Sequence, residues 1–218
     1  MEQIDLQLQT ADYMSETIVA KLENQKNVLW LVPGGSSIEV ALLVAKALAG
    51  KDLSHLTMTL TDERYGEVGH ADSNWQQILD GGFDLPGAKL IPILTGDTIV
   101  ETVDTFGDII TAALKEADFS LGFFGIGLDG HTAGILPDSL AVSVSMPTVG
   151  YDAGNFQRIT ITPSIIATLD EAVVYAVGEN KWPIIEQLKS DIDIVKQPAQ
   201  ALKEAKKLTI FSDYKGAI

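Results

Sequence analysis

The stretch NVLWLVPGGSSIEVALLVAKALAG (residues 27–50) carries the pattern that decides the fold class. Residues 27–33 form an almost continuous apolar run, which is typical of a strand buried on both faces. After a Pro-Gly-Gly turn, residues 36–50 repeat apolar side chains with helical period and end at Gly50, a common helix terminator. The stretch therefore predicts one strand, one tight turn and one helix.

The same alternation continues along the chain. Further strands are expected at 56–64, 89–94, 119–127, 157–163, 171–178 and 208–213, and helices at 73–80, 101–117, 181–190 and near 199–207. Strands alternating with helices indicate βαβ units, so we expect an α/β fold with a Rossmann-like, mainly parallel sheet and helices on both faces. Residues 137–156 are expected to form a long loop. No repeat or linker is evident, which predicts a single domain over 1–218.

The composition excludes several classes of function. Acidic residues outnumber basic ones 30 to 15, for a formal charge of −15, so neither nucleic acid nor an anionic membrane is an expected partner. The chain has no cysteine, which removes disulfides, thiolate catalysis and Cys-ligated zinc. With no signal-peptide profile and no apolar run long enough to span a bilayer, we expect a soluble cytoplasmic protein, a monomer or small homo-oligomer.

Ligands of open α/β sheets bind beyond the carboxyl ends of the strands, so polar clusters that follow strands are candidate sites. The first is PGGSS (33–37). Gly34 and Gly35 allow a sharp turn with exposed N–H groups, and Ser36 or Ser37 can cap the helix and hydrogen-bond an anion at its positive end. An ordinary strand-to-helix turn is the alternative. It is not a P-loop, because no G-K-[ST] follows.

The second cluster is TDER (61–64) with DSN (72–74). Asp62 and Glu63 end a predicted strand, so their carboxylates are expected at the ligand-binding edge, where one could orient a substrate hydroxyl or a histidine. Arg64 could hold an anion or pair with Glu63. The alternative is a solvated acidic strand end.

The third cluster, GIGLDGHTAG (125–134), contains the G-x-G-x-x-G pattern of dinucleotide-binding proteins. That function requires a helix of normal length after the third glycine, yet Pro137 follows Gly130 by seven residues. Asp129 would also repel a pyrophosphate, although Asp152 lies near the spacing expected of a ribose-binding acid. The sequence therefore argues against dinucleotide binding by these glycines.

His131 in the same loop is the candidate catalytic residue. An imidazole with a pKa near 6.5 can accept a proton at neutral pH, and Asp129 two residues earlier can fix its tautomer. A structural histidine bonded to backbone is the alternative. The chain has only three histidines, without close ligand spacing, so no metal site is expected.

Two cations complete the candidate site. Arg158 begins a predicted strand, and Lys181 opens the helix that follows VVYAVGEN (173–180). In so acidic a chain, basic side chains at ligand-facing edges suggest a phosphate site shared with the glycine–serine turn. Either one alone could be a surface charge.

Taken together, these stretches resemble the 6-phosphogluconolactonases, within the larger family that includes glucosamine-6-phosphate deaminases. The matching pieces are GGSS (34–37), TDER to DSN (61–74), GIGLDGHTAGILP (125–137), RITIT (158–162) and VGENK (177–181). The resemblance implies a Rossmann-like domain of the NagB/RpiA/CoA transferase type. It also implies cofactor-free hydrolysis of 6-phospho-D-glucono-1,5-lactone, in the oxidative pentose phosphate pathway.

The resemblance also implies roles for individual residues. His131 would be the general base that activates water, with Asp129 supporting it. The phosphate would rest on Gly34, Gly35, Ser36 and Ser37 with Arg158 and Lys181 as countercharges, and Asp62 and Arg64 would line the sugar side.

A glucosamine-6-phosphate deaminase or isomerase is the main alternative. Deaminases usually carry DEY where this chain has DER (62–64), and they place a Glu five residues after the histidine, where this chain has Leu136. Because leucine cannot exchange protons, these positions favour the lactonase. A non-catalytic sugar-phosphate-binding protein on the same fold stays open as a third hypothesis.

Overall fold

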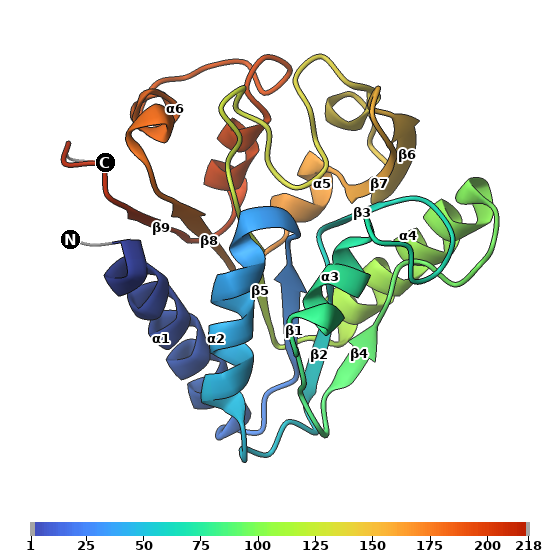
Figure 1. Ribbon diagram of the computed structural model, residues 1–218, viewed down its shortest axis with the longest axis vertical. Coiled ribbons are helices and arrows are strands. Elements are labelled where there is room, and N and C mark those ends of the chain that lie inside the picture. The colour runs from blue at the N-terminus through green and yellow to red at the C-terminus, as the bar shows by residue number, and fades with distance from the viewer. Residues whose placement is uncertain (1–2, 217–218) are drawn as a thin grey trace.

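The computed structural model describes residues 3–216 and contains a six-stranded parallel sheet in the order β4-β2-β1-β5-β8-β9 (Figure 1). Its strands are β1 (Val28–Val32), β2 (Leu56–Leu60), β4 (Lys89–Ile91), β5 (Phe119–Phe124), β8 (Glu171–Ala176) and β9 (Leu208–Ser212). Every neighbouring pair in this sheet is parallel. The predicted α/β class with a mainly parallel sheet is therefore confirmed.

The helices lie on both faces of this sheet. They are α1 (Gln3–Leu22), α2 (Ile38–Leu48), α3 (Asn74–Asp80), α4 (Ile99–Glu116), α5 (Pro163–Ile166) and α6 (Trp182–Gln187). The chain moves outward from β1 through β2 to β4, and then returns past β1 to β5. Because such crossovers are right-handed, this reversal carries α4 to the face opposite α2. Figure 1 shows α1, α2 and α3 in front of the sheet and α4 passing behind α3.

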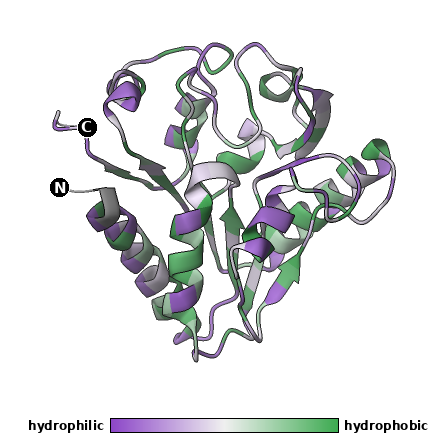
Figure 2. Ribbon diagram, viewed as in Figure 1, coloured by the Kyte–Doolittle hydropathy of each residue, from purple (hydrophilic) through white to green (hydrophobic). Residues whose placement is uncertain are grey.

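The core is built on the central strands. All five residues of β1 and all six of β8 are buried, as expected for strands covered on both faces. Trp30, Phe123 and Phe124 are among the largest fully buried side chains. Figure 2 shows hydrophobic residues along β1 and a mixture of hydrophobic and polar residues on α1 and α2.

A second, three-stranded antiparallel sheet lies beyond the carboxyl ends of β1 and β2, in the order β3-β7-β6. Its strands are β3 (Asp62–Arg64), β6 (Thr148–Asp152) and β7 (Gln157–Ile161). The prediction of one strand over 56–64 is thus wrong, because the chain changes sheets at Thr61. The Thr61 N–H donates to the Val32 carbonyl at 2.9 Å, while the Thr61 carbonyl accepts from the Ile161 N–H at 3.0 Å.

Three other predictions need correction. The predicted strand at 157–163 exists as β7 but is antiparallel and outside the main sheet, and the expected loop 137–156 contains β6. The helix expected near 199–207 is a 3₁₀ segment, Pro198–Glu204. Helix α1 was not predicted from the sequence.

None of the helices within residues 3–216 is long and apolar enough to cross a membrane. The limits of the predicted single domain, 1–218, stay a prediction, because residues 1–2 and 217–218 lie outside the described part of the chain.

Candidate active site

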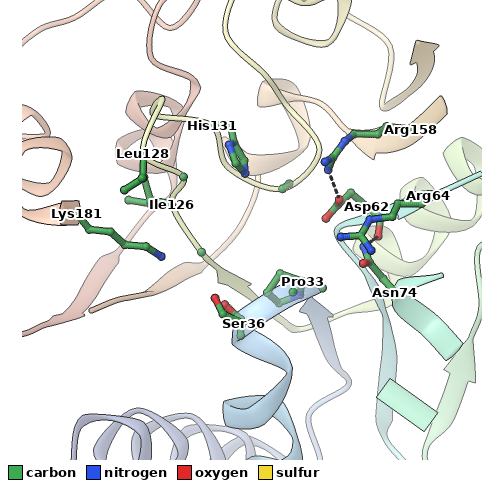
Figure 3. A pocket seen from close by; sticks show the side chains of 16 residues that line it. Pro33, Ser36, Asp62, Arg64, Asn74, Ile126, Leu128, His131, Arg158 and Lys181 are labelled. Atoms are coloured by element: carbon green, nitrogen blue, oxygen red, sulfur yellow. Dashed lines mark hydrogen bonds and ion pairs between the residues drawn. The ribbon is translucent and has the colours of Figure 1, made fainter. Parts of the chain in front are cut away.

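A cavity of about 380 Å³ opens where the loops after β1 and β5 meet the second sheet (Figure 3). This volume is within the range of small-molecule sites. The predicted site residues that line it are Gly34, Gly35, Ser36, Ser37, Asp62, Arg64, His131, Arg158 and Lys181. Asp129, the remaining predicted residue, is not part of the cavity lining but is hydrogen-bonded to His131. The structure thus brings together segments that are up to about 150 residues apart in the sequence.

The turn after β1 presents backbone and hydroxyl groups to the cavity. Gly35 has φ +66°, a left-handed conformation that favours glycine, and it starts a short 3₁₀ turn over Gly35–Ser37 that leads into α2. Ser36 is exposed and directed at the cavity (Figure 3), whereas Ser37 is buried. Ser37 occupies the N-cap position of α2, but its side chain makes no capping hydrogen bond. The prediction that a serine side chain caps this helix is therefore wrong.

Asp129 orients His131. The imidazole Nδ1 lies 2.6 Å from Asp129 Oδ1, and the His131 backbone N–H donates to the same oxygen at 3.1 Å. Burial alone would raise the pKa of Asp129, but the backbone N–H and the imidazole of His131 outweigh it and hold the pKa below its ordinary value. An ionised Asp129 accepts a hydrogen bond from the Nδ1–H of His131, which leaves Nε2 as the basic nitrogen.

The glycines of this loop serve the His–Asp pair rather than a pyrophosphate. A Cβ on Gly127 would lie 2.7 Å from Asp129 Oδ1 and closer still to the imidazole, so only glycine fits beneath the pair. Gly130 has φ +81° and accepts a hydrogen bond from the Ala199 N–H at 2.9 Å. No helix follows Gly130 until a short 3₁₀ turn at Leu140–Val142, which argues against a dinucleotide site.

Asp62 and Arg158 form an ion pair at the cavity wall. Arg158 Nη1 lies 3.5 Å from Asp62 Oδ2, and the Thr61 hydroxyl donates to Oδ1 at 2.9 Å. Asp62 is only 4% exposed, so desolvation raises its pKa, and the positive charge of Arg158 offsets part of this rise. The carboxylate therefore reaches the cavity wall, as predicted, but with a basic partner already in place.

Glu63 does not belong to the cavity, contrary to the expectation of an exposed strand-end carboxylate. It is fully buried at the N-terminus of α3, where it accepts the backbone N–H groups of Asn74 at 2.6 Å and Trp75 at 3.0 Å. The Ser73 hydroxyl donates to it at 2.9 Å, and the Arg64 backbone N–H at 2.7 Å. Burial raises its pKa, and these donors counteract the rise. Glu63 thus anchors α3 to β3.

Asn74 is a cavity residue that the sequence analysis did not single out. Its Nδ2 donates to the Asp62 carbonyl at 2.9 Å, and its side chain fills the space where a Cβ on Gly34 would have to be. Asn74 therefore fixes the spacing between the glycine–serine turn and β3. Its position in DSN, next to Ser73, which caps α3, was the signal available in the sequence.

The predicted cations enter the cavity from opposite sides (Figure 3). Lys181 comes from the turn after β8, and Arg64 and Arg158 come from the second sheet, with His131 between the two groups. None of the ion pairs found within residues 3–216 involves Lys181. Partial burial lowers the pKa of Lys181, so an anion beside it would be stabilising. Arg64 donates to the Asp72 carbonyl at 3.0 Å and does not pair with Glu63 through its side chain.

Comparison with known proteins agrees with this architecture. The chain is 26% identical to a 6-phosphogluconolactonase of Pseudomonas aeruginosa, over 84% of this chain and 81% of the relative. It is 24% identical to one of Chlamydia trachomatis, over 83% and 73%. The crystal structure of a 6-phosphogluconolactonase from Shewanella baltica superposes with a TM-score of 0.84 at 21% identity, covering 97% of this chain and 94% of that one.

The family match covers nearly the whole chain. A family described as glucosamine-6-phosphate isomerases/6-phosphogluconolactonase matches residues 2–211, which include every element that contributes to the cavity. The chain therefore belongs to the glucosamine-6-phosphate isomerase/6-phosphogluconolactonase family.

Proposed function

We propose that this chain is a 6-phosphogluconolactonase, which hydrolyses 6-phospho-D-glucono-1,5-lactone to 6-phosphogluconate in the oxidative pentose phosphate pathway. The observation that carries the proposal is an imidazole held by a carboxylate, His131 Nδ1 to Asp129 Oδ1 at 2.6 Å, in a cavity that also contains a glycine–serine turn and Lys181. The curated relatives described above bear the same name.

The proposed reaction uses His131 as a general base. With its Nδ1–H hydrogen-bonded to the Asp129 carboxylate, His131 presents Nε2 to a water molecule. Nε2 takes a proton from the water as the water oxygen adds to the lactone carbonyl carbon. The tetrahedral intermediate collapses by breaking the bond to the ring oxygen, which leaves with the proton from Nε2. The acid product then loses a proton at neutral pH. Such acid–base catalysis contributes roughly 10²–10⁴-fold.

The phosphoryl group would bind at the start of α2. The backbone of Gly34–Ser37, the Ser36 hydroxyl and the positive end of α2 suit an anion there, and Lys181 supplies a full charge. Asp62, Arg64 and Arg158 would then face the rest of the sugar. Since Arg158 enters from the side opposite Lys181, we assign it to the substrate but not to the same phosphoryl oxygen atoms.

The residues near His131 favour hydrolysis over deamination. Leu136 follows His131 by five residues and carries no exchangeable proton, so ring opening and isomerisation of an amino sugar would lack a proton-transfer group. A non-catalytic sugar-phosphate sensor would have no use for a His–Asp pair that packs so closely over Gly127.

A coupled assay with freshly generated 6-phosphogluconolactone tests the proposal. His131→Ala should abolish catalysed hydrolysis, measured above the spontaneous rate. Phosphosugar binding should be largely kept, because the glycine–serine turn and Lys181, which would hold the phosphoryl group, are unchanged. Release of ammonia from glucosamine 6-phosphate by the wild type would favour the deaminase instead. Binding of both ligands without turnover of either would identify a sensor.

We also propose that the chain works in the cytoplasm, as a monomer or small homo-oligomer, with a phosphosugar lactone as its partner rather than nucleic acid or a membrane. The formal charge of −15 supports this proposal, because it repels polyanions.

A further inference from the structure

Asp213 lies just after the last strand, beside the turn that carries Lys181. In the parallel register of β8 and β9, Ala176 is opposite Ser212, so the two strands end level with each other. The chain after β8 turns at Gly178 toward Lys181, whereas the chain after β9 continues directly into Asp213. Figure 1 shows β8 and β9 side by side below α6, the helix that follows Lys181. The register therefore places a carboxylate beside a turn that begins 35 positions earlier in the sequence.

The Asp213 carboxylate bonds residues at both ends of this turn. Its Oδ1 and Oδ2 accept the Gly178 backbone N–H at 3.1 and 3.2 Å. Oδ1 also accepts the indole N–H of Trp182 at 2.9 Å. Because Gly178 begins the turn and Trp182 directly follows Lys181, one carboxylate connects residues on either side of the lysine. The Lys181 backbone N–H closes the turn by donating to the Gly178 carbonyl at 2.9 Å.

Two further features restrict the turn to one arrangement. Gly178 has φ +114°, a conformation that favours glycine, and a Cβ there would lie 2.9 Å from Asn180 Oδ1. The ring of Tyr214, the residue after Asp213, packs edge-on against Trp182, with ring centres 6.3 Å apart. The chain after β9 thus holds the turn through a carboxylate and through an aromatic contact.

The carboxylate does not pair with the lysine that its contacts surround. None of the ion pairs found within residues 3–216 involves Asp213 or Lys181. The Lys181 side chain points into the cavity instead (Figure 3). A lysine side chain has four flexible carbons, so the place where its ammonium enters the cavity depends on how firmly its backbone is held.

We propose that Asp213 is a positioning residue for Lys181. By bonding Gly178 and Trp182, it fixes the turn from which the ammonium reaches the phosphoryl group of the substrate. The inference rests on the function proposed above, in which Lys181 holds that group. Asp213 does not line the cavity itself, so its effect on binding passes through Lys181.

The first measurement compares 6-phosphogluconolactone with D-glucono-1,5-lactone, which lacks the phosphoryl group. Asp213→Ala should raise KM for the phosphorylated lactone by about threefold or more, because misplacing the ammonium loses part of a charge-assisted contact. The increase should not exceed that of Lys181→Ala. kcat for the phosphorylated lactone and kcat/KM for the unphosphorylated one should not change. Equal losses on both lactones would overturn the proposal.

A double variant tests whether Asp213 acts through Lys181. Lys181→Ala/Asp213→Ala should have the same KM as Lys181→Ala, because residues that act as one unit are not additive. Additive increases in KM would refute the positioning role. Trp182→Phe keeps an aromatic ring but removes the indole N–H, and it should raise KM in the same direction by less. That variant decides the question where Asp213→Ala does not fold, and an unchanged KM in it would then count against the proposal.

Asp170→Ala is the matched control. Asp170 is half-buried like Asp213 and also accepts a backbone N–H from a neighbouring segment, that of Ser120 at 2.8 Å, but at the opposite end of the sheet. We expect this variant to lower the melting temperature without changing KM. An increase in KM equal to that of Asp213→Ala would show that KM follows stability, and the positioning role would be lost.

Titration calorimetry with 6-phosphogluconate separates this inference from the proposed function. A wild type that hydrolyses the lactone, and whose affinity falls in Lys181→Ala but not in Asp213→Ala, loses only the positioning role. A wild type without turnover, whose affinity falls in both single variants and no further in the double variant, keeps that role and loses the lactonase assignment. Unchanged affinity in Lys181→Ala would refute the positioning role, because Asp213 would then have no phosphoryl contact to support.

Discussion

Replacing Gly127 by alanine tests whether the loop after β5 exists to hold the His–Asp pair. The added Cβ would lie 2.7 Å from Asp129 Oδ1 and closer to the His131 imidazole, whereas ordinary van der Waals contact begins at 3.4 Å. Asp129 must therefore retreat by about 0.7 Å and the imidazole by more. Gly127 does not have a positive φ, so the substitution changes space rather than backbone conformation.

The expected loss follows from this displacement. A shift of about 1 Å in a catalytic group can cost on the order of 10²-fold in rate. We therefore expect kcat/KM of Gly127→Ala to fall by roughly 10²-fold, equivalent to about 2.7 kcal/mol of transition-state stabilisation. The loss in kcat/KM should not exceed that of His131→Ala, because that variant has no imidazole at all.

The assay follows lactone hydrolysis above the spontaneous rate, with thermal melting recorded on the same protein. Gly50→Ala is the matched control, since Gly50 follows the far end of α2, has φ +78° and has open space around its Cβ position. We expect that variant to lose about 1 kcal/mol of stability, from the left-handed conformation, with kcat/KM unchanged.

Wild-type activity in a folded Gly127→Ala variant would refute the assignment of His131 and Asp129 as the catalytic pair. The same conclusion would follow if Gly127→Ala and Gly50→Ala lost equal activity, because the loss would then track stability rather than the position of the imidazole.

Further predictions concern three charged residues. Lys181→Ala should raise KM for the phosphorylated lactone about tenfold or more and leave an unphosphorylated lactone unaffected; equal losses on both substrates would exclude a phosphate contact. Asp129→Asn should lower kcat by roughly 10²-fold or more, since an amide no longer fixes the imidazole tautomer. The pKa of Asp129 in the folded state lies below its ordinary 3.8. The stability that this carboxylate adds is therefore present above pH 3.8 and is lost as pH falls through the lowered pKa. The free energies of unfolding of wild type and Asp129→Asn, measured in urea, should converge in acid. Glu63 has the opposite sign, because its pKa is raised in the folded state. The stability that follows from this shift is present below pH 4.5 and is lost as pH rises through the raised pKa, so Glu63→Gln should gain stability relative to wild type as pH rises above 4.5. A constant difference in the free energy of unfolding would contradict the burial argument.

Local sequence patterns determined the main sheet and most of the residues predicted to meet at the candidate site. Apolar runs and helical periods depend on neighbouring residues, so residues 27–50 alone predicted β1, its turn and α2. The carboxyl ends of parallel strands meet at one edge, and polar residues after each strand were therefore expected to converge there. The His–Asp pair was also predictable from the local sequence, because only Gly130 separates Asp129 from His131.

Only the tertiary structure decided how the chain leaves that sheet. The change of sheets at Thr61 depends on backbone hydrogen bonds to Val32 and Ile161, the latter 100 residues away, and no local period encodes it. That change buries Glu63 beneath α3 and turns Asp62 and Arg64 to the cavity, although the three are adjacent in the sequence. Side-chain direction in a strand alternates with each residue, and which side becomes core is fixed by what packs against it.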